Sequence, residues 1–515
     1  MGKQMFPKEE ATERTELIPI LDRDAALCER GNGICETVDG IEMDVDKDLP
    51  TELEPHFTLL STVLFAVGQT IGSGIFVSPN EVIKQVGSPG MALVIWLLSG
   101  FISLTGALSF AELGTMIKRS GGEYQYLKAA YGDLLAFVYV WMCGVIRNAM
   151  GCAVIALTFS SYLISIFLSH EYPHFLLMKK TGAAAAIVII IAINAYSTKC
   201  GIRMANLFCV LKLGALFALT VLGAWKLGEG GVENIKVGFK DTDMNPGTWT
   251  TAFFAALWSY SGWNCINLMA GEIKNPSKNV PRALVISQIM LISVYLLANT
   301  AYCSILTLQE LYEVDAIALF VGKKMLARYG DFWGRFGEVF FGVSVVVSTY
   351  GSLSSSLMAS SRLGFIAAQE GMFPKCVGLI QSNTGTPIVG LLYMGFTAFM
   401  CVWPSNITHL IAYVGFLSWF WWGLCFLAVP VLRWRLPCCP RQFKVNLLIP
   451  AIAVLSTVYL VIGPFFVNPY PCFLWIAITL IGVPIYYGFV DEEKTCSRWM
   501  GKVNDVLAKI LRAEL

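Results

Sequence analysis

Twelve long apolar stretches follow one another along this chain, and they constrain its fold more than any other feature of the sequence. Each is close to the ~20 residues that an α-helix needs to cross about 30 Å of hydrocarbon. Inside a bilayer, every backbone polar group must be satisfied within the protein, which an α-helix does by itself. The sequence therefore predicts an all-α, polytopic membrane protein with twelve transmembrane helices.

The predicted spans are 57–80, 90–116, 134–167, 181–198, 205–227, 249–270, 283–305, 337–360, 387–403, 407–432, 446–467 and 472–490. An even number of spans returns both termini to one side of the membrane. Lys and Arg residues are more frequent in the loops on that side, so the positive-inside rule predicts that both termini are cytosolic. Lys179, Lys180 and the basic residues of the 306–336 loop count against this bias.

Polar segments flank the spans. Residues 1–54 are rich in Glu and Asp and poor in aromatic residues, which predicts a disordered acidic cytosolic tail. Residues 55–490 form the predicted twelve-helix domain, and residues 491–515 a cytosolic C-terminal segment. We expect the plasma membrane as the location. Because residues 13–18 fit an acidic dileucine sorting signal, an endosomal or lysosomal membrane stays open.

The composition excludes several classes of function. Apolar residues make up 56% of the chain and charged residues 14%, which leaves too little polar surface for a soluble protein of this size. A net charge of +1 without a basic stripe argues against a nucleic-acid partner. The chain has no CxxC motif, and its four histidines fall at span ends or in loops. We therefore predict no metal, no cofactor and no catalytic residues, so that a membrane enzyme is the weaker hypothesis.

The first span contains a break. Gly72, Ser73 and Gly74 interrupt the apolar run at mid-membrane depth, where water cannot compensate for a weakened helix. An unwound helix midpoint leaves N–H groups unpaired and presents the positive end of a half-helix dipole, which together suit a carboxylate. The alternative is that the two glycines form a small-residue packing face between helices.

The sixth span contains a second break. Hydroxyl groups, amides and a glycine occur in the middle of this apolar run, in the sequence Ser259-Tyr260-Ser261-Gly262-Trp263-Asn264. Backbone carbonyls freed there could bind an ammonium group. Spans one and six are corresponding members of two five-helix halves, which is where transporters with inverted repeats have their discontinuous helices. The matched pair indicates a binding site more strongly than either break alone.

Four motifs in the same order resemble those of the L-type amino acid transporter family, the light chains of heteromeric amino acid transporters in the APC superfamily. They are Gly72-Ser73-Gly74-Ile75-Phe76-Val77-Ser78-Pro79, Phe110-Ala111-Glu112-Leu113-Gly114-Thr115 running into Ser120-Gly121-Gly122-Glu123-Tyr124, Ser259-Tyr260-Ser261-Gly262-Trp263-Asn264, and Ser361-Arg362-Leu363 followed by Glu370-Gly371. The resemblance covers roughly residues 55 to 490. It implies a LeuT-like fold with inverted five-helix repeats and discontinuous helices one and six.

The resemblance also implies roles for individual residues. The first break would hold the substrate carboxylate, and the carbonyls of the second break would hold the amino group. Trp258 would gate the site, and Asn264 and Cys265 would shape the side-chain pocket. The implied substrate-binding residues are Ile71, Gly72, Ser73, Gly74, Trp258, Ser259, Ser261, Asn264 and Cys265.

Two cations lie well inside predicted spans, away from the span ends. Lys212 is in the fifth span, where the resemblance implies that its ammonium takes the place of a sodium ion. Alternatively, the lysine snorkels to the nearer interface, since only about 10 Å of helix separates them. Arg147, near the middle of the third span, is too deep to reach either headgroup layer and should face the bundle interior. With Asn148 it is a candidate for the pocket or its gate.

The resulting functional prediction is sodium-independent transport of neutral L-amino acids by alternating access, with exchange as the mode that the resemblance implies. Asn264 is the reason for preferring neutral substrates, because family members that accept cationic amino acids carry Asp at this position. Cationic or broad-range exchange is the alternative, and sodium-coupled uptake is a weaker one.

Besides amino acids and lipid, a single-span glycoprotein heavy chain is a candidate partner. No disulfide to it is expected, because no cysteine lies between Cys152 and Cys200.

Overall fold

The computed structural model describes residues 57–117, 121–168, 172–196, 198–231, 233–268, 273–314, 316–381, 387–404, 406–437, 439, 441–489 and 513–514. One compact unit, Leu53–Arg435 with Arg441–Leu515, carries all the helices described below. Of the other unit, Met1–Glu52 with Leu436–Pro440, only three residues are described. The predicted tail 1–54 and nearly all of the C-terminal segment 491–515 therefore lie outside the described residues.

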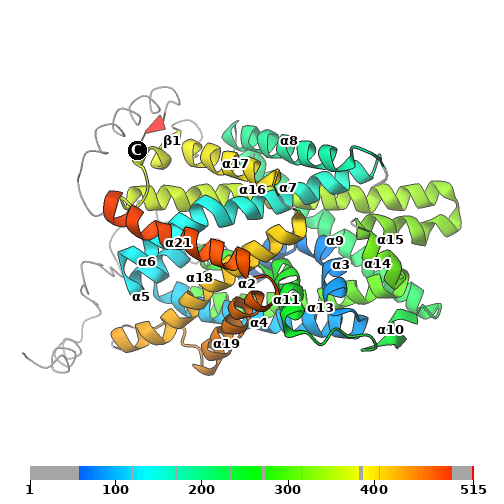
Figure 1. The fold of residues 1–515 in the computed structure, drawn as a ribbon, viewed down its shortest axis with the longest axis horizontal. Helices are drawn as coiled ribbons and strands as arrows, with labels where there is room; N and C mark the ends of the chain where they lie inside the picture. The colour runs from blue at the N-terminus through cyan, green and yellow to red at the C-terminus, as the bar shows by residue number, and fades with distance from the viewer. Residues whose placement is uncertain are drawn as a thin grey trace, which may run out of the picture. The chain divides into compact units, whose positions relative to one another are not determined.

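Helices are the secondary-structure elements of the first half of the chain in the described residues (Figure 1). Its elements are α2 (Leu59–Thr70), α3 (Gly74–Val86), α4 (Pro89–Met116), α5 (Glu123–Tyr131), α6 (Asp133–Met142), the π-helical turn η1 (Cys143–Arg147), α7 (Asn148–Ser165), α8 (Phe175–Tyr196), α9 (Thr198–Gly228), α10 (Glu233–Val237), α11 (Pro246–Tyr260) and α12 (Cys265–Leu268).

The second half adds α13 (Pro276–Ile305), α14 (Leu308–Glu313), α15 (Ile317–Leu326), the 3₁₀ turn η3 (Ala327–Tyr329), α16 (Asp331–Gln369), the 3₁₀ turn η4 (Lys375–Gly378), α17 (Ile388–Val402), α18 (Ile407–Arg435), α19 (Leu448–Ile462), α20 (Pro464–Val467) and α21 (Pro469–Phe489). Two short strands, β1 (Ile380–Gln381) and β2 (Ala513–Glu514), pair antiparallel. The long helix α16 packs against α7, α9 and α15 (Figure 1).

The helices confirm the predicted all-α, polytopic fold. Within the described residues, nine helices are long and apolar enough to cross a membrane, and α2 with α3, bent by 53° at the predicted first break, makes ten. The second break is also present, because α11 ends at Tyr260 and α12 begins at Cys265. Since α11 and α17 have only 15 residues each, the count of twelve spans stays a prediction, as do the inverted repeats.

Some helix limits differ from the predicted spans. α16 covers 39 residues where 337–360 was predicted, and α8 begins six residues before residue 181. Helical hydrogen bonding continues past the apolar part of a helix, so hydropathy underestimates the length. Hydropathy also missed the short helices α5, α10, α14 and α15, because they lie between the apolar runs.

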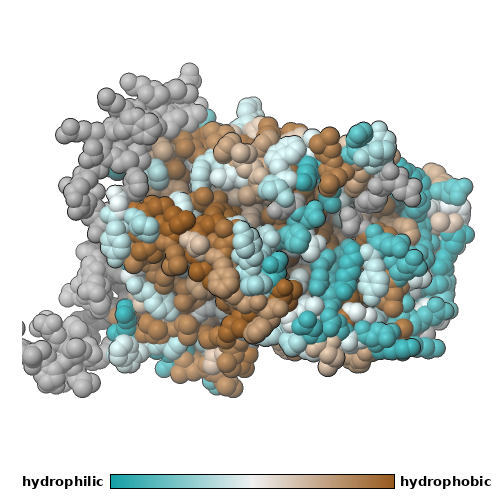
Figure 2. Space-filling view, in the orientation of Figure 1, coloured by the Kyte–Doolittle hydropathy of each residue, from teal (hydrophilic) through white to brown (hydrophobic). Residues whose placement is uncertain are grey.

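The outer surface is apolar where lipid would contact it. Figure 2 shows hydrophobic residues gathered over α19 and α21, and hydrophilic residues near α10, α14 and α15. Large side chains on α19 and α21 are exposed, among them Leu448, Leu455, Phe473 and Leu480. The exposed apolar surface of these helices is the pattern expected of a membrane-embedded protein.

The two broken segments pack directly against each other. A Cβ atom added to Gly74 would lie 2.5 Å from the Cα atom of Ser259, so only glycine permits this approach of α3 to α11. At the second break, a Cβ on Gly262 would lie 3.3 Å from the carbonyl oxygen of Gln69. Gly262 also has a φ of +117°, which favours glycine. The alternative that Gly72 and Gly74 form only a packing face is therefore incomplete: Gly74 packs closely against α11, and the helix is also interrupted between Thr70 and Gly74.

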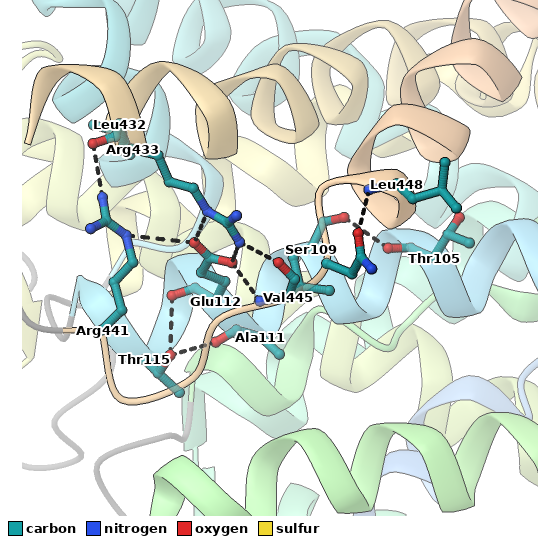
Figure 3. A network of polar contacts seen from close by, with 11 residues as sticks. Thr105, Ser109, Ala111, Glu112, Thr115, Leu432, Arg433, Arg441, Val445 and Leu448 are labelled. Atoms are coloured by element: carbon teal, nitrogen blue, oxygen red, sulfur yellow. Dashed lines mark hydrogen bonds and ion pairs between the residues drawn. The ribbon is translucent and has the colours of Figure 1, made fainter. Parts of the chain in front are cut away.

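A buried carboxylate fixes the end of α18 to α4. Glu112 of the predicted Phe-Ala-Glu-Leu-Gly motif is 2% exposed and accepts hydrogen bonds from Arg433 Nε at 2.8 Å and Nη2 at 2.5 Å (Figure 3). The backbone N–H of Val445 donates to the same carboxylate at 2.8 Å, and Arg441 Nε lies 3.6 Å from it. The buried Glu112 carboxylate is thus paired with the Arg433 guanidinium and hydrogen-bonded to it. Removing either side chain would leave the charge of the other uncompensated.

A second carboxylate joins α5 to the end of α16. Glu370 accepts hydrogen bonds from Tyr124 at 2.8 Å, Gln125 at 2.7 Å and Lys128 at 2.5 Å. Burial raises the pKa of Glu370, but these hydrogen bonds stabilise the carboxylate more strongly, so its pKa lies below the ordinary value. Contacts from two neighbouring turns of α5 therefore hold this helix beside the end of α16.

We predict that Gly262→Ala lowers the stability of the purified protein, because a residue with a Cβ in this left-handed conformation is destabilised by roughly 1–2 kcal/mol. The measurement is the apparent melting temperature in detergent. Gly214→Ala in α9 is the matched control, since a Cβ there has no neighbour within 4 Å. Equal melting temperatures for the two variants would show that the second break does not need glycine.

Candidate functional site

A cavity of about 370 Å³ lies where the two breaks meet. Its wall includes Gly72, Ser73 and Gly74 from the first break and Trp258, Ser261 and Asn264 from the second. Arg362 and Ile366, on the last turns of α16, also line it, so the cavity reaches from the breaks to that end of the bundle. The volume falls in the range of small-molecule sites, roughly 300–1,000 Å³.

The first break presents backbone N–H groups to this cavity. α3 begins at Gly74, and the first N–H groups of a helix have no acceptor within the helix. They carry the positive end of the helix dipole, which favours a negatively charged group. Thr70, at the end of α2, also lines the cavity, and its buried hydroxyl has no hydrogen-bond partner among the described residues. This side of the cavity is therefore chemically suited to a carboxylate.

The second break presents carbonyl groups, although some already accept hydrogen bonds. The carbonyl of Trp258 accepts one from the Ser261 hydroxyl at 2.7 Å. The carbonyl of Ser259 accepts one from the Tyr295 hydroxyl at 2.9 Å. The Trp258 carbonyl also accepts a hydrogen bond from the Ser261 backbone N–H at 3.3 Å, which uses both of its lone pairs. The Ser259 carbonyl has a second lone pair to which an ammonium group could donate.

Lys212 does not line the cavity but lies directly behind the first break. Lys212 belongs to α9, and its side chain is buried. Its ammonium donates to the backbone carbonyl of Gly68 in α2. Gly68 is in the last turn of α2, where carbonyl groups lose their helical partners. This geometry differs from that of a snorkelling lysine, whose ammonium would reach the solvent.

Asn264 is joined to a carboxylate that sequence reasoning did not single out. Its side-chain amide donates to Glu123 Oε1 at 2.7 Å, and Trp422 Nε1 donates to the same oxygen at 3.2 Å. Glu123 begins α5 after Gly122, whose φ of 54° favours glycine and turns the chain into the helix. Because residue 264 is asparagine, the sequence led us to expect a pocket without a carboxylate. Glu123 of α5, which is distant in the sequence, brings a carboxylate to Asn264.

Arg147 faces the bundle interior, where it contacts polar and aromatic groups. It is the last residue of the π-helical turn η1, a type of irregularity that is frequent at functional sites. Its Nε donates to Ser418 Oγ at 2.7 Å, and its Nη1 donates to Asn148 Oδ1 at 3.3 Å. Its guanidinium carbon lies 5.3 Å from the centroid of the Trp422 ring.

Most of the predicted site residues therefore come together around one cavity. Gly72, Ser73, Gly74, Trp258, Ser261, Asn264, Cys265, Arg147 and Asn148 line it, whereas Ile71, Ser259 and Lys212 do not. Ile71 and Ser259 are buried and contribute backbone at the breaks. The residues not predicted as site residues include Glu123, Tyr139 and Trp422. Only the position of Glu123 within a recognised motif could have indicated it. Among the described residues, no cluster of side chains could hold a metal ion.

Comparison with known proteins is consistent with this site. A sequence profile described as amino acid permease matches residues 57–490. The chain is 35% identical to the human large neutral amino acids transporter small subunit 2, over 84% of this chain and 80% of that protein. It is 33% identical to the mouse b(0,+)-type amino acid transporter 1, over 85% and 88% of the two chains. It is 31% identical to the human cystine/glutamate transporter, over 90% of each chain.

The profile match covers residues 57–490, and the similar proteins are transporters rather than enzymes. The predicted family is confirmed, and so is the prediction that the protein is not an enzyme. The chain belongs to the amino acid permease family of the APC superfamily, among the L-type amino acid transporters.

Proposed function

We propose that this protein exchanges neutral L-amino acids across the membrane without sodium. The observation that supports this proposal most directly is the cavity between the two breaks, which offers N–H groups on one side and carbonyls on the other. An amino acid has a carboxylate and an ammonium group on the same carbon atom and matches both sides. The side chain would then extend toward Asn264 and Cys265.

The transport cycle follows from the helix breaks. A discontinuous helix can change the angle between its halves without unfolding either half, so α3 and α11 can move against α2 and α12 around a bound substrate. In the predicted orientation, Arg362 and Ile366 lie toward the cytosol, which makes this an inward-facing cavity. Rocking of the bundle would close this end and open the opposite one.

Lys212 is proposed to make the cycle independent of sodium. The buried ammonium already contacts the Gly68 carbonyl beside the first break. A tethered cation can stabilise carbonyl groups freed at a break in the way that a dissolved sodium ion would. The break then needs no ion from solution.

Charge in the cavity decides between the neutral and cationic alternatives. The carboxylate of Glu123 favours the cationic alternative, whereas the guanidinium of Arg147 opposes it.

We also propose the plasma membrane as the location, with both termini in the cytosol. A heavy chain, if one associates, would bind without a disulfide bond.

We predict that purified protein in proteoliposomes takes up leucine faster than arginine or glutamate, and only when the vesicles contain an internal amino acid. Replacing sodium by choline outside should leave the rate unchanged. The measurement is uptake of labelled amino acids with and without internal substrate. Uptake into empty vesicles at the same rate would contradict exchange, and faster uptake of arginine than of leucine would favour the cationic alternative.

We predict that Lys212→Met abolishes this uptake while the protein still reaches the membrane, because methionine keeps the length of the side chain but not its charge. Lys226→Met, in the same helix and at a half-buried position, is the matched control and should transport normally. The measurement is leucine uptake normalised to the amount of reconstituted protein. Sodium-independent uptake by Lys212→Met at the native rate would contradict the proposed role.

We predict that the protein expressed in cells gives no reducible high-mass band on a non-reducing gel. The connection between α7 and α8 contains no cysteine that could form an intermolecular disulfide bond. A band that disappears on reduction, and also after mutation of Cys303 or Cys472, would identify a covalent partner attached at a different loop.

A further inference from the structure

Glu123 has no cationic partner among the described residues, although it is buried in the cavity wall. It is 7% exposed, and its two hydrogen-bond donors, Asn264 and Trp422, are both neutral. Among the described residues, no ion pair includes it. Two other buried carboxylates, Glu112 and Glu338, each have an ion-pair partner, and so does the half-buried Glu370. An uncompensated buried charge is destabilising, which suggests that it acts on something that enters the cavity.

Arg147 is the matching positive charge and lies over the ring of Trp422. The indole N–H of Trp422 donates to Glu123, while its ring face contacts the Arg147 guanidinium. The other contacts of Arg147, to Ser418 and Asn148, are again neutral. The two charges therefore share one aromatic side chain without forming an ion pair. Arg362 also lines the cavity but is exposed, so solvent screens its charge more strongly.

A buried carboxylate and a half-buried guanidinium in one cavity wall balance each other, yet together they distinguish between charged side chains. Charges at low effective dielectric interact by several kcal/mol over short distances. An anionic side chain near Asn264 would be repelled by Glu123, and a cationic side chain near Asn148 would be repelled by Arg147. A neutral side chain meets neither penalty.

We propose that Glu123 sets the charge selectivity of the cavity: its carboxylate balances Arg147 across Trp422 and so excludes amino acids with anionic side chains. This inference rests on the proposed function and names the residue that restricts its substrate class. It also changes the interpretation of Asn264, whose amide holds the Glu123 carboxylate in the cavity wall rather than merely lacking a charge.

The competing explanation is that Glu123 only anchors α5 to α12 and α18. The two explanations differ in what a neutral, isosteric side chain would do. Glutamine at position 123 can still accept hydrogen bonds from Asn264 and Trp422 through its carbonyl oxygen, so the anchor is largely retained. Only the charge is removed, which leaves Arg147 as the unbalanced charge in the cavity.

The test compares uptake of labelled leucine, glutamate and arginine by exchange in proteoliposomes. Glu123→Gln should raise the ratio of glutamate to leucine uptake by about tenfold or more, the change that corresponds to ~1.4 kcal/mol. Arg147→Gln should change selectivity in the opposite direction and raise the ratio of arginine to leucine uptake. Opposite changes in two ratios cannot result from general damage, which would lower all rates together.

Glu370→Gln is the matched control, because it removes a carboxylate that anchors α5 but does not line the cavity. It should leave both ratios at the native values. Should a variant lose all transport, the shift in melting temperature on adding each amino acid gives the same comparison for binding to purified protein.

Unchanged ratios in Glu123→Gln, with leucine exchange intact, would overturn the proposal and leave Glu123 as an anchor. A similar rise in the glutamate ratio in Glu370→Gln would also overturn it, because the effect would then come from loosening α5. Failure of the proposed function is distinguishable from both outcomes, since the native protein itself would then exchange no neutral amino acid.

Discussion

The structure depends on the rule that backbone polar groups inside a membrane must find partners within the protein. Breaking α2–α3 and α11–α12 at mid-membrane depth frees several such groups at once, and side chains from other helices satisfy some of them. Lys212 donates to the Gly68 carbonyl, and the Tyr295 hydroxyl reaches the carbonyls of both Ser259 at 2.9 Å and Thr70 at 3.4 Å. One tyrosine of α13 therefore bridges the two breaks. The groups that remain available face the cavity.

Much of this arrangement could be predicted because it depends on local sequence. Length and hydropathy indicate spans. Glycine with polar residues at the middle of two corresponding spans indicates a break in each, whereas a single pair of glycines fits a packing face equally well. The limits of α8 and α16 could not be predicted, because helices extend beyond the hydrocarbon. The π-helical turn that orients Arg147 could not be predicted either, because the apolar run continues through it without interruption.

The function of Glu123 could not be predicted for a different reason. Its contacts join residues 141 and 299 positions apart in the sequence, and a single sequence contains no record of such pairs. Sequence reasoning evaluated Asn264 by its own chemistry, as an uncharged residue. In the folded protein, the meaning of that amide depends on the carboxylate it binds. A prediction of pocket charge from residues of one helix is therefore incomplete whenever a loop helix such as α5 also contributes to the wall.

The position of α5 also links selectivity to the transport cycle. Glu123 binds α12 and α18 at the cavity, while the next residues, Tyr124 and Gln125, bind Glu370 at the end of α16. If α11 changes its angle to α12 during transport, as proposed, α5 cannot keep its contacts to Asn264 and to Glu370 both unchanged. A substrate that disturbs Glu123 would then alter the same contacts that join α5 to the end of α16. Recognition of side-chain charge and closure of the cavity would in that case share one short helix. The backbone groups of the breaks, which contact what all amino acids have in common, would remain the same for every substrate.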